Sequence, residues 1–428
     1  MLDLTPELLP RLESHRLPGL DLGPQGYAPR YDGYSLANLP AGIFRFLGAE
    51  PFDNMASALD DALLGPLAGR YRRVVLGVID GLGLEQFQAA LADPETGLAE
   101  ALGEEAVLAP LTSVVPATTS TALTTLWTGA YPAEHGVVGY EMYLKEYGVT
   151  ANMILHAPAT FAGDVGSLSK AGFRPETFLP VPGVATGLSA QGVQTTVLQY
   201  YAIARSGLST MLFQGAKVAP VWSLSDLFVS LEERLSARGD GREYLYFYWS
   251  ALDDLMHRYN PGDERVRLEL TVLARHLGRF LARARSQGQG DTLFLLTADH
   301  GHVSTPLRSV CDLREQPELL NCLSMLPAGE SRLAFAFLRP GREQRFLEGL
   351  EQAWPGSLRV YPSEQALAAG LFGPRGMHPR LPDRVGDVIL AAQGDTSLWW
   401  SSKENVMLGR HGGLTRTEML VPLVATTI

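Results

Sequence analysis

The stretch RRVVLGVIDGLG, residues 72–83, gives the clearest indication of how this chain folds. It is a β-branched apolar run that ends in Asp-Gly-Leu-Gly. An uninterrupted apolar run is typical of a parallel strand buried on both faces, and the glycines indicate a loop at its carboxyl end. Asp80 is therefore expected at the sheet edge where open α/β folds carry their functional sites.

Similar apolar runs recur along the chain, with helical segments between them. They are QTTVLQY (194–200), YLYFYWS (244–250) and TLFLLTADHG (292–301). One intervening segment, 263–287, begins at Asp263 after a Pro-Gly pair, which predicts an N-capped helix. This alternation predicts an α/β fold with a mixed, mainly parallel central sheet flanked by helices.

Three regions depart from that alternation. Residues 1–70 have five prolines between Pro6 and Pro29, so we expect an irregular arm over the core. Residues 140–192 are rich in Gly, Ala and Pro and are interpreted as a loop-rich excursion. Residues 303–400 contain the apolar run 332–338 and further short strand and helix patterns, which predicts a small inserted α+β cap. The α/β core should then comprise residues 1–302 and 401–428.

The composition excludes several classes of protein. The 428 residues are 46% hydrophobic and 19% charged, which is ordinary for a globular chain. A net charge of -11 argues against a nucleic-acid polymer as partner, because like charges repel. No stretch approaches the roughly 18 apolar residues of a spanning helix, and Asp3 and Glu7 occupy a region that is basic in signal peptides. We expect a cytoplasmic protein without a membrane partner, in which Cys311 and Cys322 remain thiols rather than forming a local disulfide.

Aspartate and histidine residues cluster at the expected strand ends. They are Asp80 in VIDGLG, Asp253 and His257 in SALDDLMH, Asp299 and His300 in TADHG, and His411 in GRHGG. Carboxylate and imidazole together suit zinc or its first-row neighbours, so this set is a candidate site for two divalent metal ions. Taken singly, Asp80 and Asp299 could equally be turn or loop residues. We interpret His135 as a buried structural residue, and leave His302 open between a residue behind the ligands and an exposed one.

The segment VVPATTSTALTTLWTGAYPAEHGVVG, residues 114–139, predicts a helix that starts within its threonine-rich part. A hydroxyl at the start of a helix faces the positive end of the helix dipole, and a metal ion would activate it as a nucleophile. The alternative is that Thr118, Thr119, Ser120 and Thr121 only cap the helix. These residues alone leave both interpretations open.

Together, the motifs resemble the type I phosphodiesterase and nucleotide pyrophosphatase branch of the alkaline phosphatase superfamily. The resemblance covers residues 72–140, 244–305 and 384–425. That family has a threonine nucleophile ten residues before the Gly of a TGxYPxxHG signature, and Gly129 in TGAYPAEHG places Thr119 there. The resemblance implies an alkaline-phosphatase-like core and two metal sites. One would be held by Asp253, His257 and His411, and the other by Asp80, Asp299, His300 and the Thr119 oxygen.

Two departures from the family pattern bear on the substrate. Members that cleave nucleotides have an aromatic residue after the nucleophile, where this chain has Ser120. Many members also have an asparagine 21 residues after the threonine, where this chain has Tyr140. A phenol can donate one hydrogen bond in place of the two of an amide, so Tyr140 is the candidate substrate-binding residue.

The resemblance implies a metal-dependent hydrolase of phosphoric diester or pyrophosphate bonds that acts through a phospho-threonine intermediate. It also implies two divalent metal ions, with zinc as the default, and a small phosphorylated substrate. Within enzymes, the alternatives are a carbon–phosphorus hydrolase like phosphonoacetate hydrolase and a phosphomonoesterase. Outside enzymes, the alternative is a metal-binding protein without catalysis.

Overall fold

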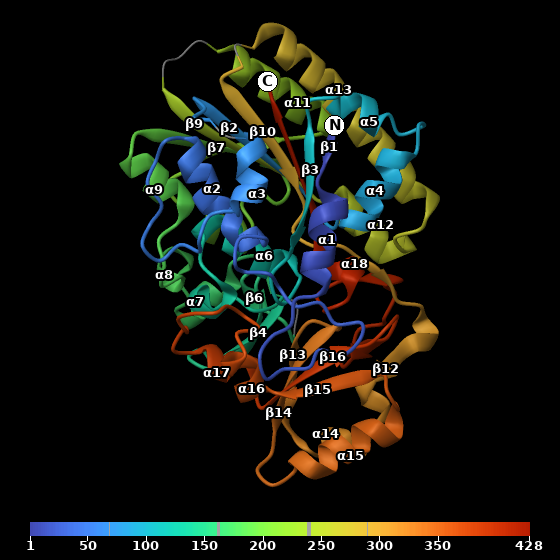
Figure 1. Cartoon of the computed structure of the whole chain (residues 1–428). Helices are drawn as coiled ribbons and strands as arrows, with labels where there is room; N and C mark the ends of the chain where they lie inside the picture. The colour runs from blue at the N-terminus through green and yellow to red at the C-terminus, as the bar shows by residue number, and fades with distance from the viewer. Residues whose placement is uncertain (68, 161–162, 238–240, 289) are drawn as a thin grey trace.

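A computed structural model of the chain describes residues 1–428 except 68, 161–162, 238–240 and 289. Two sheets dominate it: a large central sheet between helices, and a smaller second sheet at one end (Figure 1). Both termini lie at the end away from the second sheet. The arrangement agrees with the expected α/β fold.

The central sheet has eight strands, in the order β1-β3-β19-β10-β2-β9-β7-β8. In that order they span Leu2–Asp3, Val107–Thr112, Leu420–Thr427, Thr292–Thr297, Arg73–Ile79, Arg242–Trp249, Val193–Tyr200 and Lys217–Val221. All neighbours pair in parallel except β19, which runs antiparallel to β3 and β10. The expected mixed, mainly parallel sheet is therefore confirmed. Every residue of β2 is buried, as its apolar sequence predicts.

Helices cover the central sheet in two groups that contact one another within each group. One group comprises α4 (Leu84–Ala92), α5 (Leu98–Leu102), α11 (Leu224–Ser236), α12 (Ala251–Tyr259) and α13 (Glu264–Gln287). The other comprises α2 (Leu39–Phe46), α6 (Thr119–Thr128), α8 (Pro175–Phe178), α9 (Val184–Ala190) and α10 (Gly207–Leu212). Helix α13 begins where predicted, because the Asp263 side chain accepts the Arg265 backbone N–H.

The first 70 residues are more regular than their prolines suggest. They contain α1 (Thr5–Glu13), α2 and α3 (Asp61–Leu64), with irregular stretches between them. Pro6 and Pro40 stand in the first turns of α1 and α2, where a missing backbone N–H costs nothing. Leu8 and Leu12 of α1 are buried in the main core, so the segment does cover the core.

The second sheet has the order β15-β16-β14-β13-β4-β5-β6. Its strands span Leu358–Pro362, Val388–Ala392, Leu333–Leu338, Leu323–Gly329, Glu141–Leu144, Val149–Asn152 and Ala157–Pro158. The helices α14 (Pro317–Leu320), α15 (Glu343–Ala353), α16 (Ser363–Ala368) and α17 (Leu381–Val385) accompany it. The excursion thus supplies three strands to the sheet of the insertion, because β13 pairs with β4. The loop-rich excursion expected over residues 140–192 therefore contains β4, β5 and β6.

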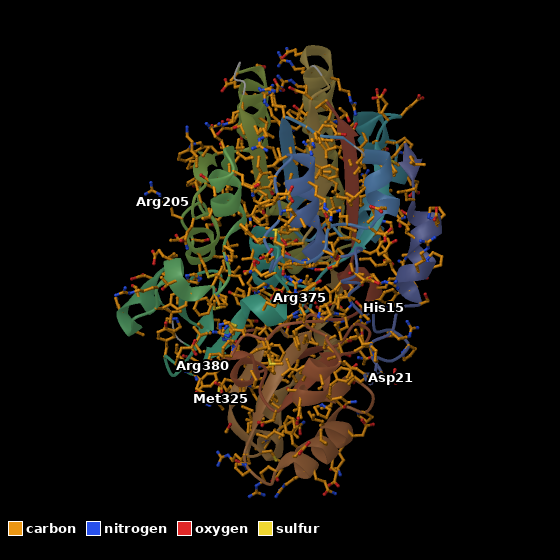
Figure 2. All side chains as sticks on the ribbon, turned by 60° about the vertical axis from the view of Figure 1, so that its left-hand side comes forward. His15, Asp21, Arg205, Met325, Arg375 and Arg380 are labelled. Atoms are coloured by element: carbon orange, nitrogen blue, oxygen red, sulfur yellow. The ribbon has the colours of Figure 1, made fainter. Side chains whose placement is uncertain are left out.

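Short elements and side-chain contacts join the two sheets. Two small ladders pair β11 (Val303–Ser304) with β18 (Gly409–Arg410) and β12 (Val310–Asp312) with β17 (Ser397–Trp399). The remaining helices are α7 (Pro132–His135) and α18 (Arg416–Met419). Arg375 lies where the part of the molecule around the central sheet meets the part around the second sheet. It donates to the carbonyls of Asn54 and Met55 at 2.6 Å (Figure 2).

Two expectations concern the whole chain. Among the residues that the structure describes, no helix combines the length and apolar character needed to cross a membrane. Cys311 and Cys322 are buried free thiols.

Candidate active site

Adjacent parallel strands bring the candidate acidic residues to one edge of the central sheet. Asp80 directly follows β2, Asp253 lies in α12 after β9, and Asp299 follows β10. Because β2 pairs in parallel with both β9 and β10, these three strand ends meet. The backbone turns sharply at Gly81, whose φ is 75° and whose N–H donates to Asp299 Oδ1 at 3.1 Å. Residues far apart in the sequence are thus gathered at a single edge.

Asp80, Asp299 and His300 form the first of two side-chain groups, here named the Asp80 group. Nε2 of His300 lies 3.4 Å from Asp80 Oδ1 and 3.6 Å from Asp299 Oδ2. All three residues are buried, and the Tyr248 hydroxyl donates to the second Asp80 oxygen. Burial, together with the negative charges of Asp253 and Asp299, raises the pKa of Asp80 well above its usual value. A bound cation would offset the repulsion among these carboxylates and favour their charged forms.

Asp253, His257, His302 and His411 form the second group, here named the Asp253 group. Nε2 of His257 lies 3.4 Å from Asp253 Oδ2, and Nε2 of His411 lies 3.7 Å from Asp253 Oδ1. Asp253 and His257 meet because they are four residues apart on α12. Although burial opposes it, the nearby His257, His302 and His411 hold the pKa of Asp253 well below its usual value.

Hydrogen bonds fix which nitrogen of each imidazole faces its group. The Nδ1 atoms of His257, His300 and His411 donate to the carbonyls of Gly409, Gly301 and Ala117, at 2.8, 3.2 and 3.2 Å. In a neutral ring with Nδ1 protonated, Nε2 carries a lone pair. All three Nε2 atoms face carboxylates, which is the arrangement of metal-binding histidines.

His302 differs from these three rings. Its Nε2 lies 2.6 Å from Asp253 Oδ1, where it donates to the carboxylate. His302 is 1% exposed, so it is not an exposed residue, one of the two possibilities that the sequence left open. Its contact is that of a residue behind the ligands, which orients Asp253.

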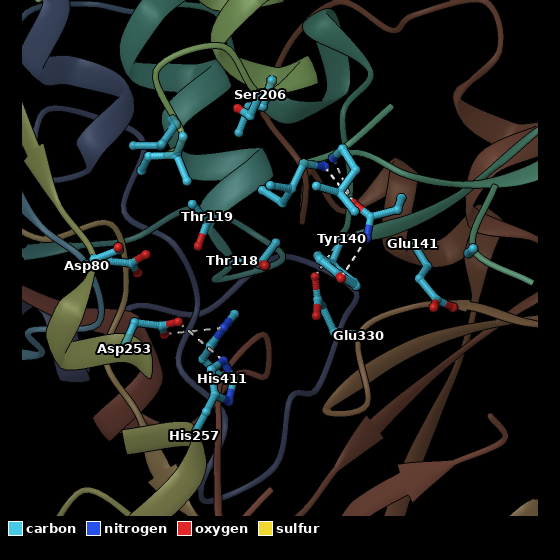
Figure 3. Close-up of a pocket in the computed structure, with 18 of the residues that line it drawn as sticks. Asp80, Thr118, Thr119, Tyr140, Glu141, Ser206, Asp253, His257, Glu330 and His411 are labelled. Atoms are coloured by element: carbon cyan, nitrogen blue, oxygen red, sulfur yellow. Dashed lines mark hydrogen bonds and ion pairs between the residues drawn. The ribbon is translucent and has the colours of Figure 1, made fainter. Parts of the chain in front are cut away.

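The Thr119 hydroxyl lies beside the Asp80 group. Thr119 is the first residue of α6, and its Oγ1 lies 3.2 Å from His300 Nε2. Figure 3 shows the hydroxyl directed towards Asp80 and Asp253. The N-cap residue Thr118 makes no side-chain capping hydrogen bond, so capping does not account for the threonines here.

The two groups are adjacent and their donor atoms fit divalent cations. The rings of His300 and His411 stack with centroids 3.7 Å apart and planes 17° apart. Within each group the ligand atoms lie within 4.8 Å of one another. The buried atoms Asp80 Oδ1 and Asp299 Oδ2 have no hydrogen-bond partner among the described residues, as expected of oxygens reserved for a cation.

A cavity of about 740 Å³ opens in front of both groups. One wall is the edge of the central sheet, which carries Asp80, Thr119, Asp253, His257 and His411. The opposite wall comes from the second sheet, its loops and the segment 397–410, which holds β17 and β18. It comprises Tyr140, Glu141, Asn152, Glu330, Trp399, Trp400, Lys403 and Arg410. Figure 3 shows Tyr140, Glu141 and Glu330 on this side.

Tyr140, the candidate substrate-binding residue, lies in this second wall. It is 41% exposed and directly precedes β4. Its backbone N–H donates to Glu330 Oε1 at 2.6 Å, and its hydroxyl receives a hydrogen bond from Asn152 Nδ2 at 2.6 Å. The structure therefore brings Tyr140 into the cavity together with two residues that the sequence did not single out.

Glu330 is the most unusual of the residues that sequence reasoning missed. It lies in the hairpin between β13 and β14 and is 8% exposed. Burial raises its pKa to about 8, although hydrogen bonds from the Thr118 side chain and the Tyr140 backbone oppose the shift. No sequence signal marks this glutamate, because its position depends on the second sheet.

His135 lies outside both groups. It is fully buried, its Nε2 is 3.0 Å from Thr125 Oγ1, and its Nδ1 accepts the Val137 N–H at 3.0 Å. The interpretation of His135 as a structural residue is confirmed.

Comparisons with known proteins agree with this geometry. A model of the type I phosphodiesterase / nucleotide pyrophosphatase family matches residues 74–414. No curated protein matches the chain significantly.

Solved structures share the fold at low sequence identity. Murine ectonucleotide pyrophosphatase / phosphodiesterase 5 (ENPP5) is 18% identical, with a TM-score of 0.59 over 82% of this chain and 87% of that one. An inactive threonine-to-alanine variant of it in complex with AMP is 16% identical, with a TM-score of 0.58 and the same coverage. Phosphonoacetate hydrolase from Sinorhizobium meliloti 1021, in complex with phosphonoformate, is 19% identical, with a TM-score of 0.60 over 83% of this chain and 90% of that one.

Proposed function

Because the chain belongs to the type I phosphodiesterase / nucleotide pyrophosphatase family, we propose that it hydrolyses phosphodiester bonds through a phospho-threonine intermediate on Thr119. It is a hydrolase that acts on phosphate ester bonds, and all residues of both groups lie within the matched range 74–414. The observation that carries the proposal is the Thr119 hydroxyl at the start of α6, 3.2 Å from His300 Nε2 and beside both groups.

A relative supports the role of the threonine. The variant of murine ENPP5 in which a threonine is replaced by alanine is inactive and was solved with AMP. In this chain Thr119 lies ten residues before Gly129 of TGAYPAEHG, which supports the same role for it.

Two divalent ions, with zinc as the expected metal, complete the proposed site. Asp253, His257 and His411 would hold one ion. Asp80, Asp299, His300 and the Thr119 oxygen would hold the other. Bound divalent cations supply charge that makes a threonine alkoxide accessible and stabilises the attacking and leaving oxygens of a phosphoryl transfer.

The chain's own residues position the reaction. Thr119 Oγ1 attacks phosphorus, the bond from phosphorus to the leaving oxygen breaks, and a threonine phosphoester remains for water to hydrolyse. The start of α6 contributes the positive end of its dipole to the attacked phosphate. The backbone N–H groups of Gly81 and His300, each 3.1 Å from Asp299 Oδ1, fix that carboxylate. His302 does the same for Asp253.

We expect a simple diester to be preferred over a monoester or a nucleotide. A monoester carries an additional charged oxygen that needs donors, and Tyr140 offers one where an asparagine would offer two. Ser120 is fully buried, so the residue after the nucleophile provides no surface for a base. Aromatic stacking on a base is worth about 1–3 kcal/mol, so nucleotide esters should gain little over aryl esters.

The test compares Thr119→Ala with Ser120→Ala on the metal-loaded protein. We expect Thr119→Ala to lower kcat on an aryl methyl phosphodiester by about a thousandfold or more, with metal content nearly unchanged. Ser120→Ala is the matched control, because the Ser120 hydroxyl is buried and has no partner among the described residues. Full activity in Thr119→Ala would overturn the assignment of the nucleophile.

A substrate panel identifies the reaction class. It compares kcat/KM for an aryl methyl phosphodiester, the matching aryl monoester, a nucleotide aryl ester and phosphonoacetate. Faster monoester turnover would instead indicate a phosphatase. Faster cleavage of phosphonoacetate would indicate a carbon–phosphorus hydrolase, and a hundredfold nucleotide preference would indicate a base-binding clamp elsewhere in the cavity.

A further inference from the structure

The wall opposite Thr119 holds Tyr140 by its backbone. The Tyr140 N–H donates to Glu330 Oε1 at 2.6 Å, and the same carboxyl hydrogen-bonds the Thr118 side chain. A single carboxyl therefore connects Tyr140 to the residue beside Thr119. Figure 3 shows Tyr140 and Glu330 across the cavity from Asp80 and Asp253.

The Asn152 side chain contacts the Tyr140 hydroxyl in only one orientation. Its Oδ1 accepts the backbone N–H groups of Ile154 and Leu155, both at 2.9 Å. A flipped amide would place its NH₂ group against those two donors, so the flip is excluded. Nδ2 must therefore face Tyr140, and it lies 2.6 Å from the phenolic oxygen.

The direction of the hydrogen bond between Asn152 and Tyr140 determines whether the Tyr140 hydroxyl can donate to another molecule. Because Nδ2 only donates, the phenolic oxygen accepts, and its own hydrogen is left unused by Asn152. No other hydrogen bond of this hydroxyl is present within the described part of the chain. The residue lines the cavity and is 41% exposed, so the hydrogen is available to a bound molecule.

We propose that Asn152 is a positioning residue that keeps the Tyr140 hydroxyl turned to donate to a non-bridging oxygen of the substrate phosphoryl group. The inference rests on the proposed function, because it requires a phosphoryl group at Thr119. Asn152 is 8% exposed and acts through Tyr140.

Asn152→Asp tests the direction of the hydrogen bond to Tyr140 while keeping an acceptor for the backbone N–H groups of Ile154 and Leu155. The substituted side chain is nearly isosteric and keeps one oxygen for Ile154 and Leu155, while its other oxygen can only accept. The Tyr140 hydroxyl must then donate to that second oxygen, which withdraws its hydrogen from the cavity. We expect kcat/KM for the aryl methyl phosphodiester to fall about tenfold to a hundredfold, as in Tyr140→Phe.

The double variant Tyr140→Phe/Asn152→Asp separates this role from added charge or altered packing. If Asn152 acts through Tyr140, the double variant is no slower than Tyr140→Phe alone. If the two losses multiply, the introduced carboxylate acts by charge or distortion, and the proposal is overturned. Tyr143→Phe is the matched control, because Tyr143 packs edge-on against Phe337 and does not line the cavity.

Two further measurements keep the outcome interpretable. Metal content and thermal unfolding show whether Asn152→Asp is folded. If Asn152→Asp does not fold, Tyr140→Phe alone is the test. Wild-type activity in Tyr140→Phe overturns the proposal. If Thr119→Ala is inactive and the losses in kcat/KM of Tyr140→Phe and Asn152→Asp multiply in the double variant, only the role of Asn152 is refuted. An active Thr119→Ala refutes the proposed function itself.

Discussion

The two walls of the cavity are built for different tasks. The wall at the edge of the central sheet holds three carboxylates and four imidazoles in two groups, and within each group the ligand atoms lie within 4.8 Å of one another. The wall from the second sheet holds hydroxyl, amide and indole groups with scattered charges, including Tyr140 and Asn152. The first wall is suited to holding cations and activating Thr119, and the second to recognising what is attached to phosphorus. Changes in the first should affect every substrate, and changes in the second should alter the preference among substrates.

Removal of metal should have the largest effect, because it disables the first wall entirely. We expect close to two equivalents of divalent metal per chain, and a loss of at least about a thousandfold in kcat for all substrates after chelation. Elemental analysis and assays before and after adding zinc check this. A fully chelated protein that keeps its activity would contradict the metal assignment.

His302→Ala should have an intermediate effect, because it removes a support of the first wall without removing a ligand. Loss of the 2.6 Å contact to Asp253 should weaken metal affinity by about tenfold to a hundredfold. Competition titration with a zinc indicator measures it. His276→Ala is the control and should leave the affinity unchanged, because His276 lies on α13 against α11, where it contacts Ser225 and Phe228 and belongs to neither group. Unchanged affinity in His302→Ala would show that Asp253 needs no such support.

Glu330→Gln should have the smallest effect and should depend on pH. Burial raises the pKa of Glu330 to about 8, so the carboxyl is neutral below that pH and gains charge above it. The side chains that interact with it are Thr118, Tyr140 through its backbone, Glu141, Asp253 and Arg410. Because the ionised form repels an anionic substrate, kcat/KM in the wild type should fall several-fold as the pH rises through about 8.

The variant should lack this decline, and the decline in the wild type should be steeper for a monoester than for a diester. Profiles of kcat/KM from below to above the pKa of Glu330, for both substrates, measure it. An identical decline in Glu330→Gln would assign the titration to another group.

The difference between the walls also explains what the sequence could predict. Asp80, Asp253, Asp299 and their neighbouring histidines follow apolar strands directly, so a local pattern places them at one edge of a parallel sheet. Glu330 and Asn152 carry no such pattern. Asn152 is brought beside Tyr140 by the pairing of β5 with β4, and Glu330 by the pairing of β13 with β4, a contact between segments far apart in the sequence.

The same reason accounts for the errors in the fold. The long apolar runs predicted the central strands β2, β7, β9 and β10 closely. The strands β4, β5 and β6 are short and form no long apolar run, and they belong to one sheet with the insertion because β4 pairs with β13. In residues 1–70 the prolines suggested irregularity, although two of them stand in first helical turns.

The position of β19 has a consequence for the order in which the protein is made and folds. This strand lies between β3 and β10, and its register pairs Leu423 with Thr297, two residues before Asp299. During synthesis, β3 and β10 emerge long before the strand that joins them. The two-stranded part β1-β3 and the five-stranded part β10-β2-β9-β7-β8 of the central sheet should therefore remain separate until residues 420–427 leave the ribosome and insert, a slow pairing of distant segments. A nascent chain should acquire its metal ions only after that insertion, since the edge carrying Asp299 and His300 is completed last.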